Sequence, residues 1–528
     1  MRGALVIVLA VASVAGLGGS PRVAGSSVTP PRTQIEFVLG LRLEEHALQR
    51  YVDRMGEPLS AAEVGARFGP PLRGVRAVTR DLESHGISVA RTFPQRTDIV
   101  ASASAAVLER YFGVPFRRYT TPDGRPYDAP AHQPVVPRRL ARWVSGVIGL
   151  DTRPLNVPHE FWNLRPVDAA AAYGLAPLHR SGLTGRGATI AVLSFQEFSK
   201  SDLDLFEHGS TFDVKGLGPP PRVVRIGSGA VSERGTEEAN LDVQVIRGTA
   251  PGATIVVYEA PNNAAGELAL LDRFAAGSTA IGSYSWGLCD VPDNFRTARD
   301  YRAYRSAINK ALAVAAARGK TLFVSSGDSG AYTCQRQDFS DHRLTVSLPA
   351  DSPYVVAVGG TVLATSRQGG YLGESAWVDT LAYAGTGGGI SPLDAKPPWQ
   401  RGVVPGPRRG VPDVAASASP TSGWIVYQDG RRIAAGGTSA SAPFWAASML
   451  IAQQYATTRG VRTRCFLAPL LYRLAGTPAF HDVTVGGNRY YAAQRGWDYA
   501  TGLGSPDVAR LAAELVRYLG SHPGDCTR

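Results

Sequence analysis

One serine in the sequence stands where backbone groups could assist a nucleophile. Ser439 lies in residues 436–447, GGTSASAPFWAA, just before a helical stretch that runs from Ser441 to about Gln454, with Pro443 where a first turn tolerates proline. At a helix N-terminus, backbone N–H groups can stabilise the oxyanion of an attacked carbonyl. An ordinary N-cap serine would look similar in isolation. The full string Gly-Gly-Thr-Ser-Ala-Ser-Ala-Pro is far more restrictive and favours a nucleophile.

A serine nucleophile needs a group that accepts its proton, and histidine is the usual one. The sequence has nine histidines, but none stands in a supporting motif. The segment EHGSTFD around His208 comes nearest to the His-Gly-Thr segment that carries the histidine of subtilisin-type peptidases. It lacks the second histidine and the helix of small residues that should follow. We therefore expect the histidines to be surface or structural residues.

Two carboxyl groups are better candidates for the base. The segment TEEANLDVQVIRGTAPGA places Glu238 and Asp242 four residues apart, so they would share one face of a helix. Neighbouring carboxylates repel when both are ionised, so one proton is shared and one pKa rises. Such a pair can act as a general base in acid. The alternative is two solvated charges on a helix surface, which is the commoner case for an arbitrary Glu-x-x-x-Asp.

A third acidic residue stands in a tight turn. Asp328, in FVSSGDSGAY, follows an apolar strand and lies between Gly327 and Gly330. An aspartate can hold an oxyanion only when it is protonated, because an ionised carboxylate repels the negative oxygen. The alternative is an aspartate that fixes the turn. Taken with Ser439, the three acidic residues predict a serine nucleophile operated by carboxyl groups at low pH.

The segments that carry these residues belong to a repeated pattern that starts near Gly187. Short apolar runs end in small or polar residues, and helical stretches lie between several of them. The runs are ATIAVLSF, TIVVYEAP, TAIGSYSWG, TLFVSSGDSG and YVVAVGGT, and the helical stretches are residues 237–247, 267–276 and 301–318. Buried strands that alternate with helices predict a parallel sheet with helices on both faces. Ligands of such sheets bind at the carboxyl ends of the strands.

The first part of the chain has a different pattern. Residues 33–43, TQIEFVLGLRL, are apolar at every second position and predict a half-buried strand. Helical patterns at residues 44–55, 72–85 and 105–112 and the strand-like stretches SVARTF and TDIVASAS complete a compact α+β unit. The stretch from residue 122 to about 166 is rich in Pro and Arg, and we expect a linker there.

Taken together, these motifs are similar to those of the sedolisin (kumamolisin-like) family of serine-carboxyl peptidases. The matching segments occur in the family's order over nearly the whole chain after its first residues. They are Glu238-Ala-Asn-Leu-Asp242, Ser285-Trp286-Gly287, Ser325-Ser-Gly-Asp328-Ser-Gly330, Gly387-Gly-Gly-Ile-Ser391, Pro412-Asp-Val-Ala-Ala416 and Gly437-Thr-Ser439-Ala-Ser-Ala-Pro443. The resemblance implies an α/β fold, with a subtilisin-like, mostly parallel sheet between helices, preceded by a smaller α+β propeptide domain.

The resemblance also implies roles for individual residues. Ser439 would be the nucleophile, Glu238 the general base and acid, Asp242 its support, and Asp328 the acid that holds the oxyanion. Trp286 and Gly287 would line the substrate cleft.

A calcium site follows from the same resemblance. The stretch FHDVTVGGNRYYAAQRGWDYATGLGSPD resembles the family's calcium loop, and calcium prefers oxygen ligands. Carboxylates of Asp482 and Asp498 and backbone carbonyls of Val483, Gln494 and Gly496 would bind the ion. The family usually has glycine where Gln494 stands, so that backbone position is a departure. A glycine-rich surface loop is the alternative.

The first residues of the chain predict where the protein is sent, and that destination decides whether its cysteines can form disulfides. Met1-Arg2, the apolar run 4–17 and the small residues that follow predict a secretory signal peptide over residues 1–26. The alternative, a membrane anchor, would need a longer apolar run. Secretion permits disulfides. Four cysteines allow three pairings, and of these we favour Cys289–Cys334 with Cys465–Cys526.

The sequence therefore predicts a secreted, extracellular acid endopeptidase, a monomer that cuts proteins or peptides and processes itself. A signal peptide (1–26), an inhibitory activation propeptide (33–150), a processing linker (151–165) and a peptidase domain (166–528) with calcium as cofactor would follow one another. The net charge of +11 comes from dispersed arginines, so we expect no nucleic-acid partner, and no membrane partner once the signal is cut. The alternatives are a tripeptidyl peptidase, a His-dependent subtilisin-type peptidase and a non-catalytic binding protein.

Overall fold

The structure is a computed structural model of the whole chain. It describes residues 27–54, 57–120, 126–152, 164–209, 214, 216–230, 235–366, 369–379, 382–419 and 422–526. The expected signal peptide lies outside the described residues, and so do residues 153–163 of the expected processing linker. Among the described residues, no helix combines the length and the apolar character that a membrane span requires.

The larger of two domains is built on an eight-stranded sheet in the order β16-β15-β13-β11-β8-β10-β9, with β21 paired to β15. All its pairs are parallel except β15 with β16. The strands are β8 (Thr189–Ser194), β9 (Arg222–Arg225), β10 (Thr254–Glu259), β11 (Ile281–Tyr284), β13 (Thr321–Ser325), β15 (Val356–Thr365), β16 (Tyr371–Ala376) and β21 (Val414–Ser417). The predicted subtilisin-like parallel sheet is confirmed.

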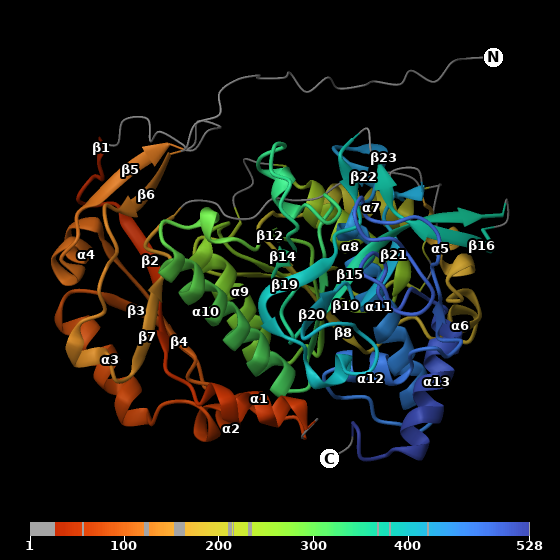
Figure 1. Cartoon of the computed structure of the whole chain (residues 1–528), viewed down its shortest axis with the longest axis horizontal. Coiled ribbons are helices and arrows are strands. Elements are labelled where there is room, and N and C mark those ends of the chain that lie inside the picture. Colours follow the sequence, from red (N-terminus) through yellow and green to blue (C-terminus); the bar gives the residue numbers. More distant parts are fainter. Residues whose placement is uncertain are drawn as a thin grey trace.

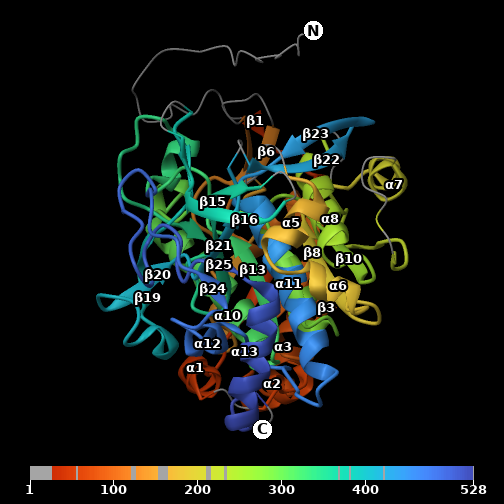
Figure 2. The same cartoon turned by 90° about the vertical axis from the view of Figure 1, so that its right-hand side faces the viewer.

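Helices cover both faces of this sheet, as the alternating pattern predicted. On the face toward the N-terminal domain lie α9 (Ala264–Ala276) and α10 (Ala298–Ala317), which pack against each other (Figure 1). On the opposite face lie α8 (Glu237–Thr249), α11 (Thr438–Thr457) and α13 (Val508–Ser521), and α11 packs against both of its neighbours (Figure 2). Apolar runs buried between these two helical layers form the core.

Shorter elements surround the sheet. Helices α5 (Pro166–Ala172), α6 (Ala176–Arg180), α7 (Lys200–His208) and α12 (Ala468–Arg473) lie around the sheet, and the short strands pair in two-stranded sheets. These strands are β12 (Leu288–Cys289), β14 (Ser347–Leu348), β17 (Val378–Asp379), β18 (Ala384–Gly385), β19 (Gly389–Ala395), β20 (Arg408–Val411), β22 (Trp424–Gln428), β23 (Arg431–Ala435), β24 (Phe480–His481) and β25 (Ser505–Pro506).

The N-terminal domain contains two antiparallel sheets and four helices. The larger sheet has the order β3-β4-β2-β7, and the smaller has the order β1-β5-β6. The strands are β1 (Ser27–Val28), β2 (Gln34–Leu41), β3 (Ser88–Thr92), β4 (Asp98–Ser104), β5 (Phe116–Thr120), β6 (Pro126–Pro130) and β7 (Val144–Ile148), and the helices are α1 (Glu45–Asp53), α2 (Ala61–Arg67), α3 (Leu72–Ser84) and α4 (Ala105–Phe112). The predicted α+β unit is confirmed.

Strand β2 corrects one prediction. Phe37, Leu39 and Leu41 pack into the core of the N-terminal domain, as their spacing predicted. The other face, expected to meet solvent, is buried too, because Val38 joins the core of the larger domain. A half-buried pattern in one domain cannot reveal that a second domain covers the polar face.

The predicted linker from residue 122 to about 166 is also partly wrong. Within it, β6 pairs with β5, and β7 pairs with β2. Residues 131–143, rich in Pro and Arg, connect these two short strands. Strands of five residues between prolines carry too little periodicity to be recognised, and their pairing partners lie far away in the sequence.

The two domains meet through buried polar contacts as well as apolar ones. Asp98 of β4 and Asp272 of α9 are buried, and the Thr97 hydroxyl donates to Asp272 at 3.2 Å. Burial and the neighbouring acid raise the pKa of Asp272. Lys310 of α10 pairs with Glu45 of the N-terminal domain at 3.1 Å. The carboxyl groups of Asp98 and Asp272 can both be buried when they share a proton.

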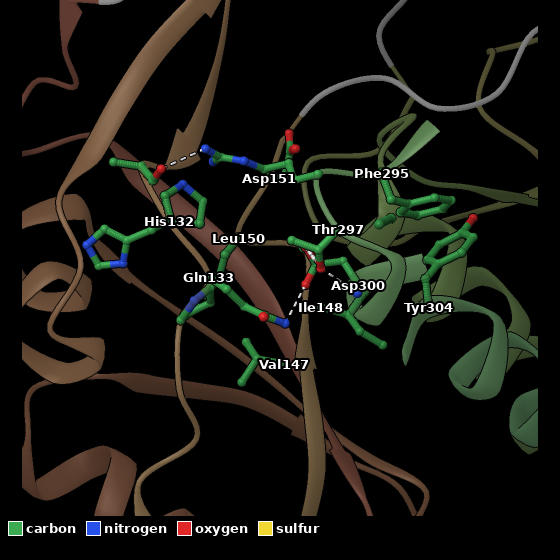
Figure 3. Close-up of a pocket in the computed structure, with 16 residues that line it drawn as sticks. His132, Gln133, Val147, Ile148, Leu150, Asp151, Phe295, Thr297, Asp300 and Tyr304 are labelled. Carbon is green, nitrogen blue, oxygen red and sulfur yellow. Dashed lines mark hydrogen bonds between the residues drawn. The ribbon is translucent and has the colours of Figure 1, made fainter. Parts of the chain in front are cut away.

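A cavity of about 340 Å³ lies beside this interface. It is lined on one side by residues 130–134 and 147–151 and on the other by residues of α9 and α10 and the loop before α10 (Figure 3). The Gln133 side chain donates to Asp300 at 2.9 Å across it. The N-terminal domain is therefore fitted to the surface of the larger domain opposite α11.

The four cysteines, all within the described residues, form two disulfides, Cys289–Cys334 and Cys465–Cys526. These are the two pairings that the sequence favoured. The first disulfide ties the strand after the Ser285-Trp286-Gly287 segment to the loop that follows Asp328. The second disulfide fixes the C-terminal end of the chain next to α12.

Candidate active site

The nucleophile turn has a backbone that glycine makes possible. Gly437 has φ +74°, in the left-handed region that side chains disfavour, and it turns the chain from β23 into α11. The helix starts at Thr438, three residues earlier than predicted, so Ser439 lies in its first turn. Backbone N–H groups in a first turn have no helical partner and are available to an anion. Ser439 itself is buried, and its hydroxyl is 3.4 Å from the carbonyl of Ser285.

Pro443 stands inside α11 rather than at its first position. It lies four residues after Ser439 and has no N–H, so the carbonyl of Ser439 receives no helical hydrogen bond from it. That carbonyl is instead 3.1 Å from the hydroxyl of Ser285. The same hydroxyl is 2.7 Å from Oδ1 of Asp242. Ser285 thus bridges the helix of the acidic pair and the helix of the nucleophile.

The acidic pair occupies a fully buried stretch of α8. Glu238 and Asp242 lie one turn apart and have no exposed surface. The Glu238 backbone N–H donates to Gln196 Oε1 at 3.0 Å, which fixes the start of the helix. Burial raises the pKa of Asp242 to about 8, although the hydrogen bond from Ser285 works in the opposite direction. The solvated helix surface that was the alternative is excluded, and Asp242 holds a proton throughout the acid range.

Asp328 lies where β13 ends, against the N-terminus of α11. Its Oδ1 accepts the backbone N–H of Thr438 at 2.8 Å and the Thr438 hydroxyl at 2.7 Å. Burial raises the pKa of Asp328 to about 6, against opposing effects from Arg336 and from the Thr438 hydrogen bonds. This carboxyl group is neutral in acid and becomes ionised near neutral pH.

Three of the four residues predicted to do the chemistry are connected through short hydrogen-bonded links, and Glu238 lies one helical turn from one of them, Asp242. Ser439 and Asp328 meet at the N-terminus of α11, and Ser285 connects Ser439 to Asp242. Helix α8, which carries Glu238, packs against α11. The site lies at the carboxyl ends of β11 and β13, the position that a parallel sheet favours.

Histidine takes no part in this arrangement among the described residues. His208 is exposed and lies beside Asp204, and His179 hydrogen-bonds the carbonyl of Thr249. His481 stacks on Tyr371. The hydrogen bonds described above for Ser439, Asp242 and Asp328 are made with Ser285 and Thr438, not with histidine.

The predicted cleft residues border the nucleophile. Trp286 and Gly287 follow Ser285 directly, at the end of β11. Trp286 is buried against Phe195, with ring centroids 5.2 Å apart. A Cβ atom at position 287 would lie 2.3 Å from the Ser347 hydroxyl oxygen and 3.1 Å from the Leu348 carbonyl oxygen, so a larger residue there would require Ser347 to move. Their role in lining the cleft stays a prediction.

Three further residues contact the predicted catalytic residues, and none of them had a role predicted from the sequence. Ser285 hydrogen-bonds Asp242, Thr438 hydrogen-bonds Asp328, and Gln196 accepts the backbone N–H of Glu238. Ser285 and Thr438 stand inside the matching motifs, next to residues with assigned roles, and that proximity is the signal that could have identified them. Gln196 could not have been found, because it meets α8 only through the fold.

Four residues of the predicted calcium loop form two hydrogen-bonded pairs. The N–H of Gly496 donates to the Asp482 carboxylate at 3.0 Å, and the N–H of Gln494 donates to Asp498 at 3.0 Å. The φ angle of Gln494 is not positive, so this backbone position does not require glycine. Within the described ranges, no group of three or more His, Cys, Asp or Glu side chains is arranged so that it could hold a metal ion. Two carboxylates with backbone carbonyls are a set of hard oxygen donors that fits calcium.

The chain matches known families in two stretches. Residues 24–153 match "Pro-kumamolisin, activation domain", and residues 228–466 match "Subtilase family". It is 34% identical over 494 residues to kumamolisin from Bacillus sp. (strain MN-32), covering 85% of this chain and 84% of that protein. It is 30% identical over 572 residues to sedolisin from Pseudomonas sp. (strain 101), covering 96% and 95%.

A solved structure agrees with these sequence similarities. Pseudomonas sedolisin, described as a serine-carboxyl proteinase complexed with two molecules of pseudo-iodotyrostatin, superposes with a TM-score of 0.57 at 30% identity. The match covers 68% of this chain and 99% of that chain.

The buried acids predict how stability changes with pH. The pKa of Asp242 is raised in the folded chain, so the folded chain binds a proton that the unfolded chain has already released between about pH 4 and 8. Stability is therefore highest in acid and falls as the pH rises through that window. In the intact chain carrying Ser439→Ala, we expect Asp242→Asn to flatten this fall, measured as the thermal midpoint from pH 4 to 8. Asp204→Asn, at an exposed position, is the matched control. An equal fall in both variants would contradict the account.

Proposed function

Because the chain belongs to the sedolisin family of serine-carboxyl peptidases, we propose that it is a secreted endopeptidase that works in acid and releases its own propeptide. One observation carries the proposal: a buried carboxyl group, Asp328, lies at the helix N-terminus that also carries the nucleophile, and its pKa is about 6. A group of this kind can donate a hydrogen bond to an oxyanion in acid and loses that ability as it ionises.

The first half of the reaction forms an acyl-enzyme. Ser439 Oγ attacks the scissile carbonyl carbon while the Glu238 carboxylate accepts the hydroxyl proton. Asp242 stays protonated in acid, and the proposal assigns the negative charge of the buried pair to Glu238. The oxyanion is held by protonated Asp328 and by the N–H of Ser439. Glu238 then gives its proton to the departing amine, and the C–N bond breaks.

The second half reverses these roles. Water attacks the ester carbonyl, Glu238 accepts a proton from the water, and the second tetrahedral oxyanion occupies the same position. The proton returns to Ser439 Oγ as the ester bond breaks, which frees the acid product. Each protein group ends in the state in which it began.

Bound calcium would stabilise the folded chain and would take no part in the reaction. Asp482 and Asp498 would hold it with the carbonyls of Val483, Gln494 and Gly496, in the loop closed by the β24–β25 pair. A divalent ion there would neutralise the two carboxylates and fix the loop after β24. No step of the peptide hydrolysis passes through this loop.

The proposed chemistry predicts a pH–rate profile. Hydrolysis of a denatured protein should be fastest in acid and should fall above pH about 6 as Asp328 ionises. Glu238→Gln should lose roughly 100- to 10,000-fold in kcat/KM, the usual contribution of a general base. Its neighbour Glu237→Gln is the matched control and should stay active. Ser439→Ala should neither cut substrate nor release its propeptide.

Full activity at neutral pH, or an active Glu238→Gln enzyme, would contradict the carboxyl mechanism. Product lengths from the same digests separate the two cutting modes. Internal fragments of varied length support an endopeptidase, whereas tripeptides alone would show a tripeptidyl peptidase.

The calcium proposal has its own test. Removing calcium with a chelator should lower the thermal midpoint of the mature chain, and added calcium should restore it, because binding to the folded state alone stabilises that state. Asp482→Asn should lower the midpoint and make it insensitive to the chelator. A midpoint that is the same with and without chelator would remove calcium from the account.

A further inference from the structure

Thr438 makes an unusual number of contacts for a residue to which no role is assigned. It is fully buried, it precedes Ser439 in the sequence, and it contacts Asp328 in space. Its N–H and its hydroxyl both lie within 2.8 Å of the same oxygen, Oδ1 of Asp328. A third hydrogen bond reaches the Thr438 hydroxyl from the backbone N–H of Gly327 at 3.1 Å.

These bonds have a fixed direction. A backbone N–H can only donate, so Gly327 uses a lone pair of the Thr438 hydroxyl. The hydroxyl hydrogen is then directed at Asp328 Oδ1 rather than elsewhere. Gly327 has φ +103°, a conformation suited to glycine, and this turn directs its N–H at the Thr438 hydroxyl. Oδ1 consequently receives two donors from one residue.

A protonated carboxyl group has two unlike oxygens. Its carbonyl oxygen accepts hydrogen bonds, while its hydroxyl oxygen carries the proton and donates it. Two donors directed at Oδ1 stabilise that oxygen as the carbonyl. We propose that Thr438 is a positioning residue that fixes the acid proton of Asp328 on Oδ2, the oxygen from which it can be donated to the oxyanion. This inference rests on the proposed function, in which Asp328 is the oxyanion acid.

The neighbouring groups set the expected pH effect. Burial raises the pKa of Asp328, while the Thr438 hydrogen bonds and the Arg336 guanidinium, on the 3-10 helix Thr333–Arg336, lower it. Removing the hydroxyl should therefore raise the pKa and move the alkaline limb of the rate profile upward. The same change should reduce kcat in acid, because the proton is no longer confined to Oδ2.

The experiment compares four variants of the full-length enzyme, after its own maturation, by kcat and KM from pH 3 to 8. Thr438→Val removes the hydroxyl at nearly constant volume, and Thr438→Ala removes it without placing a methyl group against the Gly327 N–H. Thr438→Ser keeps the hydroxyl. Arg336→Gln removes an exposed charge and raises the Asp328 pKa without disturbing Oδ1.

We expect Thr438→Val and Thr438→Ala to lose about tenfold in kcat with little change in KM, and to shift the alkaline limb up by about one pH unit, the effect of one hydrogen bond to a charged group. Thr438→Ser should stay near the native enzyme. Arg336→Gln should shift the limb upward without the loss in kcat. If Thr438→Val does not fold, Thr438→Ala decides the question by the same readout.

Two results would overturn the inference. One is a loss of kcat in Thr438→Val and Thr438→Ala with an unmoved alkaline limb, and the other is a Thr438→Ser enzyme as slow as both. Asp328→Ala is measured beside them. If that variant keeps full activity in acid, the proposed function fails. If it is inactive while Thr438→Val and Thr438→Ala behave like the native enzyme, only the inference about Thr438 fails.

Discussion

The burial of a carboxyl group against the N-terminus of α11 is the constraint on which the site depends. Out of water, the ionised form of Asp328 is disfavoured, and hydrogen bonds from Thr438 offset only part of that effect. The result is an acid that is neutral at low pH at the point where a negative oxygen would form. The helix N-terminus favours the same charge. One small region thus combines a buried acid, the N-terminus of a helix and the nucleophile.

The fold supplies the geometry through a few backbone features. Two glycines with positive φ, Gly327 and Gly437, turn the chain at the end of β13 and at the start of α11. Because Pro443 has no N–H, the carbonyl of Ser439 receives no hydrogen bond from within the helix, and it accepts one from the Ser285 hydroxyl instead. Through Ser285 the second buried acid, Asp242, is tied to the nucleophile's helix. The acids are therefore held by backbone and hydroxyl groups, and the described histidines are not needed.

The sequence predicts the strands and helices of the larger domain well, because each buried run or amphipathic stretch is long enough to show its period. It also predicts that Glu238 and Asp242 are neighbours, because they need only one helical turn to be close. Features that arise between distant segments were missed. Strand β21 has four residues and is recognised only by pairing with β15. Strand β7 and the second buried face of β2 follow from docking between segments and domains, which no local period records.

In the proposed mechanism, the proton on Asp328 holds the oxyanion. A peptide aldehyde can test this role, because the serine hydroxyl adds to the aldehyde carbonyl and leaves an oxygen in the oxyanion position without further reaction. We predict that the inhibition constant is lowest in acid and rises about tenfold per pH unit above the Asp328 pKa of about 6. In Asp328→Asn, whose amide donates at any pH, this rise should disappear. An inhibition constant that is constant from pH 4 to 8, or a rise that persists in Asp328→Asn, would contradict the claim.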